Sequence, residues 1–354
     1  MTNLFEVSHF ILEEDFIMGP KYEFTDETME YNGYLLHRIR RLSDGKIGGW
    51  IESEDNLSQE GSCWVDGEAK VYWEAKVSGN AQVYGEATVN SKAKVYENAQ
   101  VYDNAKITYN SEIYGNAQVF GDNTIIKCDA KIYDNAQVYN NAIIFGGKIY
   151  SDAKIYGEAH IFSKDVEIYG NAKVYGETRV HDQAQIYDNA QVYGGSEIKG
   201  RSKIYGNAKV KSIETGSNAK IYGDTIIYGN GYTSITDNAE VYDNAKVSGS
   251  IIIKDNVRVY GDAKITGQVH ILDDAQVYGN AIVEDDAIVL DNAKIYDNAH
   301  VYDEAKICNN VHVYEDAEVC GNSKIHDNVQ IHGNARVANT ELYGDDDITS
   351  RYSI

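Results

Sequence analysis

The chain has 354 residues and a formal net charge of −23, from 55 acidic and 32 basic residues. This excess of carboxylates argues against direct binding to nucleic acid or to an anionic membrane surface, because both need clustered lysines and arginines. Four widely spaced cysteines give no indication of a disulfide framework or a zinc cluster. The first residues lack a basic signal-peptide region, and there is no run of ~20 apolar residues. We therefore expect a cytoplasmic protein without a membrane segment, metal or cofactor.

Residues 1–62 lie outside any repeat and predict a small α+β unit. Apolar residues recur at helical spacing up to about Phe16, which predicts a short amphipathic helix. Asn32-Gly33 is the preferred two-residue turn between antiparallel strands, so a β-hairpin follows, with its second strand running through Ile39. We expect this unit to cap the repeat that follows it, because the first coil of a stacked repeat exposes an apolar end.

Two features of this N-terminal unit are candidates for binding. Trp50 suits the capping role, but an exposed tryptophan also forms a platform for a ligand. The short basic run is the one cationic cluster of the chain, and as alternate residues of a strand its arginines face both sides of the hairpin. Arginines bind phosphate groups, yet we favour pairing with nearby carboxylates such as Asp44 and Glu52. The candidate residues are Arg38, Arg40, Arg41 and Trp50.

From Val65 to about Leu342 the sequence repeats with a period of six. Residues 275–280, Ala-Gln-Val-Tyr-Gly-Asn, are a clear copy, and a Val or Ile recurs at every sixth position from Ile235 to Val337. Alternating apolar and polar residues predict a strand with one buried face. The Gly-Asn or Asp-Asn pair that ends many copies tolerates positive φ and predicts a bend. Each copy is therefore one four-residue strand and one corner, and the copies must stack in parallel to bury their inner faces.

This pattern resembles that of the hexapeptide-repeat proteins, with an aliphatic residue at position one and Ala, Ser, Thr or Val at position five. The resemblance implies an all-β, left-handed parallel β-helix, a three-sided solenoid with eighteen residues per coil. Position two departs from the family's pattern, because this chain prefers tyrosine there. We expect the solenoid to span residues 63–343 and residues 344–354 to form an acidic tail or cap. Register slips between Val210 and Ile235 predict bulged or shortened corners.

Tyrosine occupies the outward position after the Val or Ile of most copies. Counting by eighteen residues places these tyrosines in columns that stack as ladders, which stabilises a sheet by roughly 0.2–1 kcal/mol per pair. That role alone explains them, but a flat row of tyrosines also suits docking of a protein or a carbohydrate, because tyrosine combines apolar area with a hydroxyl. One predicted ladder is Tyr242, Tyr260, Tyr278, Tyr296 and Tyr314; a second is Tyr169, Tyr187 and Tyr205, with Tyr175 and Tyr193 on the next face.

The most familiar activity of the hexapeptide-repeat family is acyl transfer from acyl-coenzyme A or acyl carrier protein. The resemblance implies a trimer and a histidine base at a subunit interface for that activity. Here the histidines of the repeat occupy outward strand positions with no long loop beside them, so we assign no catalytic residue. These histidines are His160, His181, His270, His300, His312, His326 and His332.

Three hypotheses of function remain. The first is a non-catalytic, rigid solenoid that binds a protein or carbohydrate partner through its tyrosine ladders or its N-terminal unit. The second is an acyltransferase whose pocket forms only in a homo-oligomer. The third is an acidic decoy that occupies the basic groove of a nucleic-acid-binding protein. We favour the first, because fold does not fix function and the repeat shows no catalytic group. The partner and the oligomeric state stay open.

Overall fold

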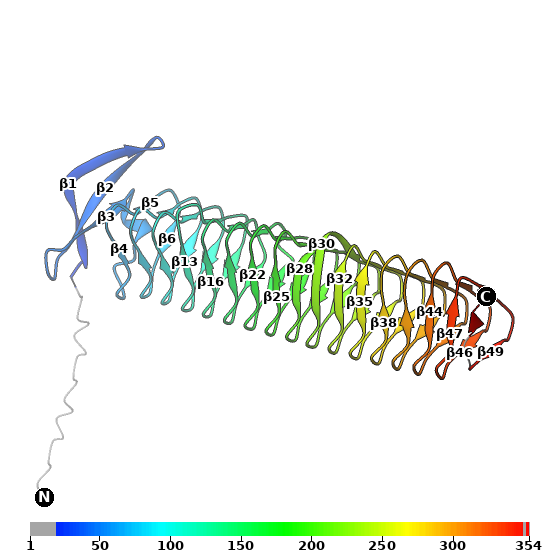
Figure 1. Cartoon of the computed structure of the whole chain (residues 1–354). Helices are drawn as coiled ribbons and strands as arrows, with labels where there is room; N and C mark the ends of the chain where they lie inside the picture. Colours follow the sequence, from blue (N-terminus) through cyan, green and yellow to red (C-terminus); the bar gives the residue numbers. More distant parts are fainter. Residues whose placement is uncertain (1–18, 350–351, 354) are drawn as a thin grey trace, which may run out of the picture.

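The computed structural model describes residues 19–349 and 352–353. The chain forms a parallel β-solenoid of about 17 turns, in which strands from successive coils pair with one another. Figure 1 shows the coils stacked into one long rod, with a hairpin at the N-terminal end and the C-terminus at the far end. The all-β solenoid predicted from the period of six is confirmed. No helix in these residues is long and apolar enough to cross a bilayer. The helix expected up to Phe16 lies outside the described residues.

An antiparallel hairpin precedes the rod. β1 (Tyr22–Tyr31) and β2 (Tyr34–Arg41) pair across a turn at Asn32 and Gly33. The φ angles of these two residues, 51° and 84°, are the positive values that a two-residue hairpin turn requires. The hairpin predicted from this dipeptide is therefore confirmed. On its other side, β2 pairs with β3 (Ile47–Ile51).

β3 is also the first strand of the solenoid. It pairs in parallel with β5 (Lys70–Val71), and the short 3-10 helix η1 (Glu54–Asn56) then turns the chain toward Leu57, which forms a bridge to the next coil. The solenoid thus begins near Ile47, earlier than the start at Cys63 expected from the sequence. The sequence pattern did not predict this coil, because its residues follow the path of the later coils but do not repeat with a period of six.

Each coil has three faces, and strands of one face stack on those of the next coil. Face 1 holds β4 (Trp64–Val65), β7 (Gln82–Val83), β10 (Gln100–Val101), β13 (Gln118–Phe120), β16 (Gln137–Tyr139), β19 (Lys154–Tyr156), β22 (Lys173–Tyr175), β25 (Gln191–Tyr193), β32 (Lys246–Gly249), β35 (Lys264–Gly267), β38 (Ile282–Val283), β41 (His300–Val301), β44 (Glu318–Cys320), β47 (Arg336–Ala338) and β50 (Tyr352–Ser353).

Face 2 holds β3, β5 and their successors β8 (Thr88–Val89), β11 (Lys106–Ile107), β14 (Ile125–Ile126), β17 (Ile143–Ile144), β20 (His160–Ile161), β23 (Arg179–Val180), β26 (Glu197–Ile198), β33 (Ile252–Ile253), β36 (His270–Ile271), β39 (Ile288–Val289), β42 (Lys306–Ile307), β45 (Lys324–Ile325) and β48 (Glu341–Leu342). Between β26 and β33, the long strands β28 (Lys209–Thr215) and β30 (Ile226–Ile235) belong to faces 1 and 2 at once.

Face 3 is a separate sheet of 16 strands. It holds β6 (Lys76–Val77), β9 (Lys94–Val95), β12 (Glu112–Ile113), β15 (Lys131–Ile132), β18 (Lys148–Ile149), β21 (Glu167–Ile168), β24 (Gln185–Ile186), β27 (Lys203–Ile204), β29 (Lys220–Ile221), β31 (Glu240–Val241), β34 (Arg258–Val259), β37 (Gln276–Val277), β40 (Lys294–Ile295), β43 (His312–Val313), β46 (Gln330–Ile331) and β49 (Asp347–Ile348).

Most of these strands are two residues long, shorter than the four-residue strands predicted. The tyrosine that follows the strand already belongs to the corner: the N–H of Ala99 donates to the carbonyl of Tyr96 at 3.3 Å, which closes a tight turn around Glu97 and Asn98. The predicted inward positions are nevertheless correct, because the alanine and the Val or Ile of almost every copy are fully buried. A continuous core of small and branched side chains therefore runs through the rod.

The register slips between Val210 and Ile235 produce a bulged corner, as predicted: the pairing of β28 with β30 shifts register between Lys211 and Ile213. Both strands pass from face 1 to face 2 without a break, and β30 pairs with both β32 and β33. The extra residues therefore extend the chain across the corner. They also leave Tyr232 79% exposed, the most exposed large hydrophobic side chain among the described residues.

The parallel ladders continue beyond residue 343, where we expected a tail or cap. β49 pairs with β46, and β50 pairs with β47. Ile348 packs against the core of the rod. Residues 344–349 thus follow the path of the preceding coil although the acidic segment Gly344–Asp347 breaks the sequence pattern. Hydrogen bonds between coils hold this path: the N–H of Gln330, for instance, donates to the carbonyl of Asp346 at 2.8 Å.

Candidate interaction surfaces

The tyrosines of face 3 form one unbroken ladder, which we call the long ladder. Neighbouring rings lie 4.7–5.0 Å apart between centroids, with interplanar angles of at most 9°. Its members are Tyr96, Tyr114, Tyr133, Tyr150, Tyr169, Tyr187, Tyr205, Tyr222, Tyr242, Tyr260, Tyr278, Tyr296, Tyr314 and, at the end, His332.

The two ladders predicted from the sequence are therefore parts of one. Tyr222 joins them: it stacks on Tyr205 at 4.7 Å and on Tyr242 at 4.9 Å. Counting by eighteen missed this link, because the register slips make the spacing seventeen on one side of Tyr222 and twenty on the other. The missing or extra residues are accommodated at other corners of the coil, so the rings still stack in register.

A second, shorter ladder lies on face 1. Its rings are 4.7–5.0 Å apart with interplanar angles of at most 6°. Tyr175 and Tyr193 belong to it, on a different face from the long ladder as predicted. Lys211 of β28 follows Tyr193 in register, so the ring column ends where the long strands begin. The members are Tyr84, Tyr102, Phe120, Tyr139, Tyr156, Tyr175 and Tyr193.

Stacking in the long ladder shields the phenol groups from water. Burial, with additional repulsion from neighbouring tyrosines, raises the pKa of Tyr187 to about 12, and the pKa of Tyr296 rises to about 12 for the same reasons. The hydroxyls therefore stay protonated at neutral pH and can act as hydrogen-bond donors. Since each interior ring has a ring on both of its faces, the ladder presents ring edges and hydroxyls to a partner.

The corners carry a second kind of ladder. In one corner column, each side chain accepts a hydrogen bond from the backbone N–H one coil further on, at 2.8–3.4 Å. The last of these bonds, from the N–H of Gly344, lowers the pKa of Asp327. These Asp-rich corners therefore join successive coils as well as bending the chain. The column consists of Asp255, Asp273, Asp291, Asn309 and Asp327.

The second residue of many corners is asparagine, and these side chains also form chains of hydrogen bonds. In one column each amide donates to the side-chain oxygen of the next coil at 3.0–3.2 Å. Such a row occupies its own donors and acceptors, so it leaves few free groups for a ligand. The column consists of Asn80, Asn98, Asn116, Asn135 and Asp152.

The arginines of the hairpin are paired with carboxylates. Arg38 contacts Glu68 at 2.8 Å and lies over the ring of Trp50. Arg38 and Trp50 both donate hydrogen bonds to Glu68, and these bonds lower the pKa of its carboxyl group. Arg41 contacts Asp44 at 3.4 Å and lies over Trp64.

The other two groups named at this end also have partners. Arg40 pairs with Glu23. The expected partner Glu52 instead accepts a hydrogen bond from the backbone of Trp73. Arg38, Arg40 and Arg41 are thus each paired with a carboxylate, as favoured from the sequence.

Trp50 is nearly buried, with an exposed fraction of 7%, in a cluster with Leu36 and Tyr72. The exposed tryptophan at this end of the rod is Trp73, at 52%. Sequence reasoning missed Trp73, although one signal was available: it stands at a corner position where other copies of the repeat have Gly, Asp or Ser. A large ring at such a position has little core to enter.

The repeat histidines lie on the surface positions expected for them. His300 contacts Glu284 at 2.6 Å and His332 contacts Asp347 at 2.7 Å. Burial lowers the pKa of His312, which lies edge-on to Tyr296. No group of three or more potential metal ligands occurs among the residues that the structure describes.

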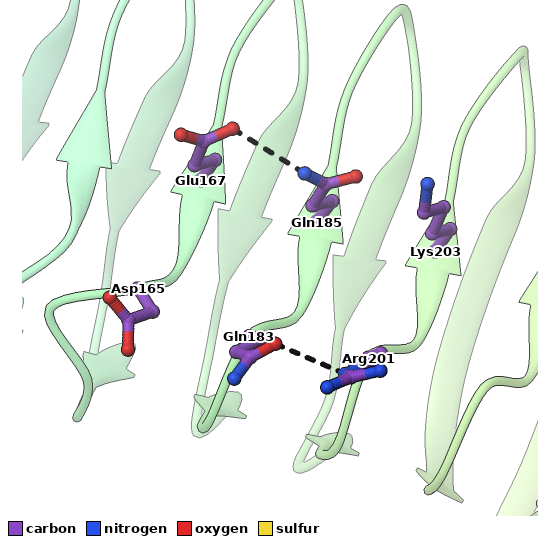
Figure 2. A pocket seen from close by; sticks show the side chains of 6 residues that line it. All are labelled: Asp165, Glu167, Gln183, Gln185, Arg201 and Lys203. Atoms are coloured by element: carbon purple, nitrogen blue, oxygen red, sulfur yellow. Dashed lines mark hydrogen bonds between the residues drawn. The ribbon is translucent and has the colours of Figure 1, made fainter.

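One surface cavity of about 420 Å³ lies between face 3 and the corner beside it (Figure 2). Two hydrogen bonds cross it, from Gln185 to Glu167 at 3.4 Å and from Arg201 to Gln183 at 3.1 Å. Its six side chains include two acids and two bases and no histidine, cysteine or hydroxyl group. The lining residues are Asp165, Glu167, Gln183, Gln185, Arg201 and Lys203.

Comparison with known proteins agrees with the architecture. A family model described as the YdcK beta solenoid repeat matches residues 184–197 and 275–291. Both stretches lie in the solenoid, and each includes a tyrosine of the long ladder, Tyr187 and Tyr278. The match supports a β-helix family and leaves the hexapeptide-repeat assignment as a resemblance. No curated protein matches the chain.

Proposed function

We propose that this protein is a non-catalytic, rigid rod that binds a protein partner along face 3. The observation that carries the proposal is the long ladder, in which tyrosine follows tyrosine over thirteen successive coils. Stability alone does not require tyrosine at each of these positions, because on face 2 the same position holds Thr236, Lys254 or Leu272. A uniform row of one aromatic residue is typical of a contact surface.

The geometry of the long ladder favours a protein over a sugar. A sugar ring stacks on an open aromatic face, and the interior rings have no open face. What they offer is a straight row of hydroxyl donors about one strand spacing, ~4.8 Å, apart. Backbone carbonyls and carboxylates on a protein surface are acceptors for such donors.

The charges on face 3 point to the same kind of partner. Although the whole chain carries −23, the outward strand positions of face 3 hold eight basic and four acidic residues. Some of these pair within the face: Glu112 contacts Lys94 at 3.4 Å and Lys131 at 3.1 Å. Face 3 is therefore a flat, mildly basic surface between acidic corners. We expect a partner that presents carboxylates or carbonyls to it.

Photo-crosslinking tests the proposal. p-Benzoyl-phenylalanine replaces Tyr278 in the full-length protein, in its native host. The matched control carries the same group at Leu272, which occupies the equivalent position on face 2 of the same coil. We expect a discrete adduct with a protein from position 278 and none from position 272. An adduct with a second copy of this chain would identify a homo-oligomer as the partner.

A binding measurement with the captured partner completes the test. Tyr278→Ser should weaken binding about tenfold, a loss of ~1.4 kcal/mol, while Leu272→Ser should leave it unchanged. Equal adducts at both positions, or none at position 278, would contradict the proposal. Turnover of acetyl-coenzyme A by the purified protein would instead favour the acyltransferase hypothesis.

A further inference from the structure

A cavity at the corner between faces 2 and 3, near the N-terminal end, has an unusual lining. Its volume is about 340 Å³, at the small end of the range of ligand pockets, about 300–1,000 Å³. Three corner residues from three successive coils line it, two aromatic and one small, and we call them the aromatic notch. They are Trp73, Ser91 and Tyr109.

The backbone of the aromatic notch is strained. Trp73 and Tyr109 have φ angles of 61° and 58°, in the left-handed region that bulky residues rarely adopt. They are the only aromatic residues with positive φ in the part of the chain that the structure describes. Most other corners place Gly, Asp or Asn there, which adopt this conformation at lower cost. Strain of this kind is typical of functional sites.

Burial does not compensate for that strain. Trp73 is 52% exposed and Tyr109 is 57% exposed. Tyr34 of the hairpin stacks on Trp73 at 5.9 Å and holds one side of its ring, whereas Tyr109 has no aromatic neighbour within the described residues. Two large rings are therefore exposed to water at strained backbone positions, and neither gains the stabilisation that burial gives a core residue. A ligand that covers them accounts for their presence.

The spacing leaves room for a ring between the two aromatic residues. Trp73 and Tyr109 are two coils apart, which is about 10 Å at ~4.8 Å per coil. The coil between them contributes the small Ser91, whose hydroxyl lies 3.2 Å from that of Thr108, and Lys92 at the rim. The gap thus has aromatic walls and a floor of hydroxyl groups. Such a gap accepts a ring with apolar faces and a polar rim.

The charges at the rim favour an uncharged ligand. Lys92 and Glu74 contact each other at 3.6 Å, so their opposite charges offset each other and the rim carries no net charge from this pair. Asn110 adds an amide to the lining. A peptide strand has no exposed backbone edge to pair with, because the backbone N–H groups of Tyr72 and Asn90 donate to the next coils. We infer that the aromatic notch binds a neutral saccharide, with a pyranose ring held between Trp73 and Tyr109.

This inference is independent of the proposed protein contact on face 3, and the test uses the full chain. The protein is screened against an array of neutral oligosaccharides, and the strongest glycan is titrated while tryptophan fluorescence is measured. Trp50 and Trp64 are buried, at 7% and 3% exposed, so the fluorescence change reports mainly on Trp73. We expect saturable binding to at least one neutral glycan.

Tyr109→Gly is the decisive variant, because it removes the ring and because glycine adopts the positive φ of this position without strain. It should bind the glycan at least tenfold more weakly and unfold at the same or a higher temperature than the wild type. Trp73→Gly should lose binding to the same extent. Tyr232→Ser, which removes an exposed tyrosine far along the rod, should bind normally.

Three outcomes would overturn the inference. The first is that no neutral glycan binds the wild type better than it binds Tyr109→Gly. The second is binding restricted to peptides or to anionic glycans. The third is a lower melting temperature for Tyr109→Gly, since that result would show that the ring holds the coils together.

Discussion

At the scale of the residue, the corner positions combine two roles. An aspartate at positive φ costs less than most residues there, and its carboxylate accepts the N–H of the coil above. The Asp-Asn pairs of the sequence predicted only the bend. Their hydrogen bonds between coils depend on residues eighteen positions apart, which a local pattern does not show. The same logic explains why Trp73 and Tyr109 stand out: they occupy such positions and provide no such bond.

Substitutions at Asp291 separate the two roles. Asp291 has a φ of 59°, and its carboxylate accepts the N–H of Asn309 at 2.8 Å. We expect Asp291→Ala to lower the free energy of unfolding by about 2 kcal/mol, because it loses the hydrogen bond and keeps a strained Cβ. Asp291→Gly also loses the hydrogen bond, but glycine adopts the positive φ without strain. Its free energy of unfolding should therefore fall by only about 1 kcal/mol. Urea unfolding measures both.

Asp291→Asn is the matched control for this pair. Its side-chain oxygen can still accept the N–H of Asn309, and asparagine also tolerates positive φ. Its stability should stay close to that of the wild type. If Asp291→Ala were as stable as Asp291→Asn, the hydrogen bond would contribute nothing.

At the scale of the element, the long ladder shows how repetition places aromatic groups. Each tyrosine follows a strand of face 3, and pairing of Val259 with Val277 sets Tyr260 directly beside Tyr278 at 4.8 Å. The strand register thus fixes the ring spacing. The sequence predicted the neighbours within each regular stretch. It did not predict that the ladder passes through Tyr222 without a break.

The long ladder should make the protein sensitive to alkaline pH. Burial raises the pKa of Tyr96, Tyr133 and Tyr187 to about 12, against about 10 for an exposed tyrosine. Above pH 10 the unfolded chain loses these protons before the folded chain does. Stability is therefore complete below pH 10 and falls as the pH rises from 10 to 12. Thermal unfolding between pH 8 and 12, with tyrosinate absorbance recorded in parallel, measures this loss.

Tyr187→Phe is the control for the alkaline effect. Phenylalanine keeps the stacked ring but has no proton to lose. At pH 7 its melting temperature should match that of the wild type, and at pH 11 it should be higher. A lower melting temperature at pH 11 would show that ionisation of Tyr187 does not destabilise the folded state.

At the scale of the whole molecule, the strand pairing joins each coil only to its neighbours, so a local defect should stay local. The hairpin at the N-terminal end is one place to test this, because Leu36 is fully buried against Trp50 and Tyr72, whereas the adjacent Leu35 is 51% exposed. Leu36→Asp should open the hairpin and the first coil, since it buries an unpaired carboxylate. Leu35→Asp should leave both intact.

Hydrogen exchange measures the extent of the defect. In Leu36→Asp, the amide of Glu52, which donates to the carbonyl of Val71, should exchange faster than in the wild type. The amide of Tyr278, which donates to Ile295 near the other end, should keep its protection. Loss of protection at both sites would show that the rod unfolds as one cooperative unit.

The sequence by itself determined the stacking of six-residue copies, the burial of alanine and of Val277 and its equivalents, and the Asn32-Gly33 hairpin. These features depend on alternation and turn chemistry within a few residues. Only the tertiary structure decided where the solenoid begins, how β28 and β30 cross a corner, and that the tyrosines of face 3 form one ladder. It also brought Trp73 and Tyr109 to the two sides of one gap. Each of these depends on the number of residues in every earlier coil, because one inserted or missing residue changes which side chains of all later coils stack on one another.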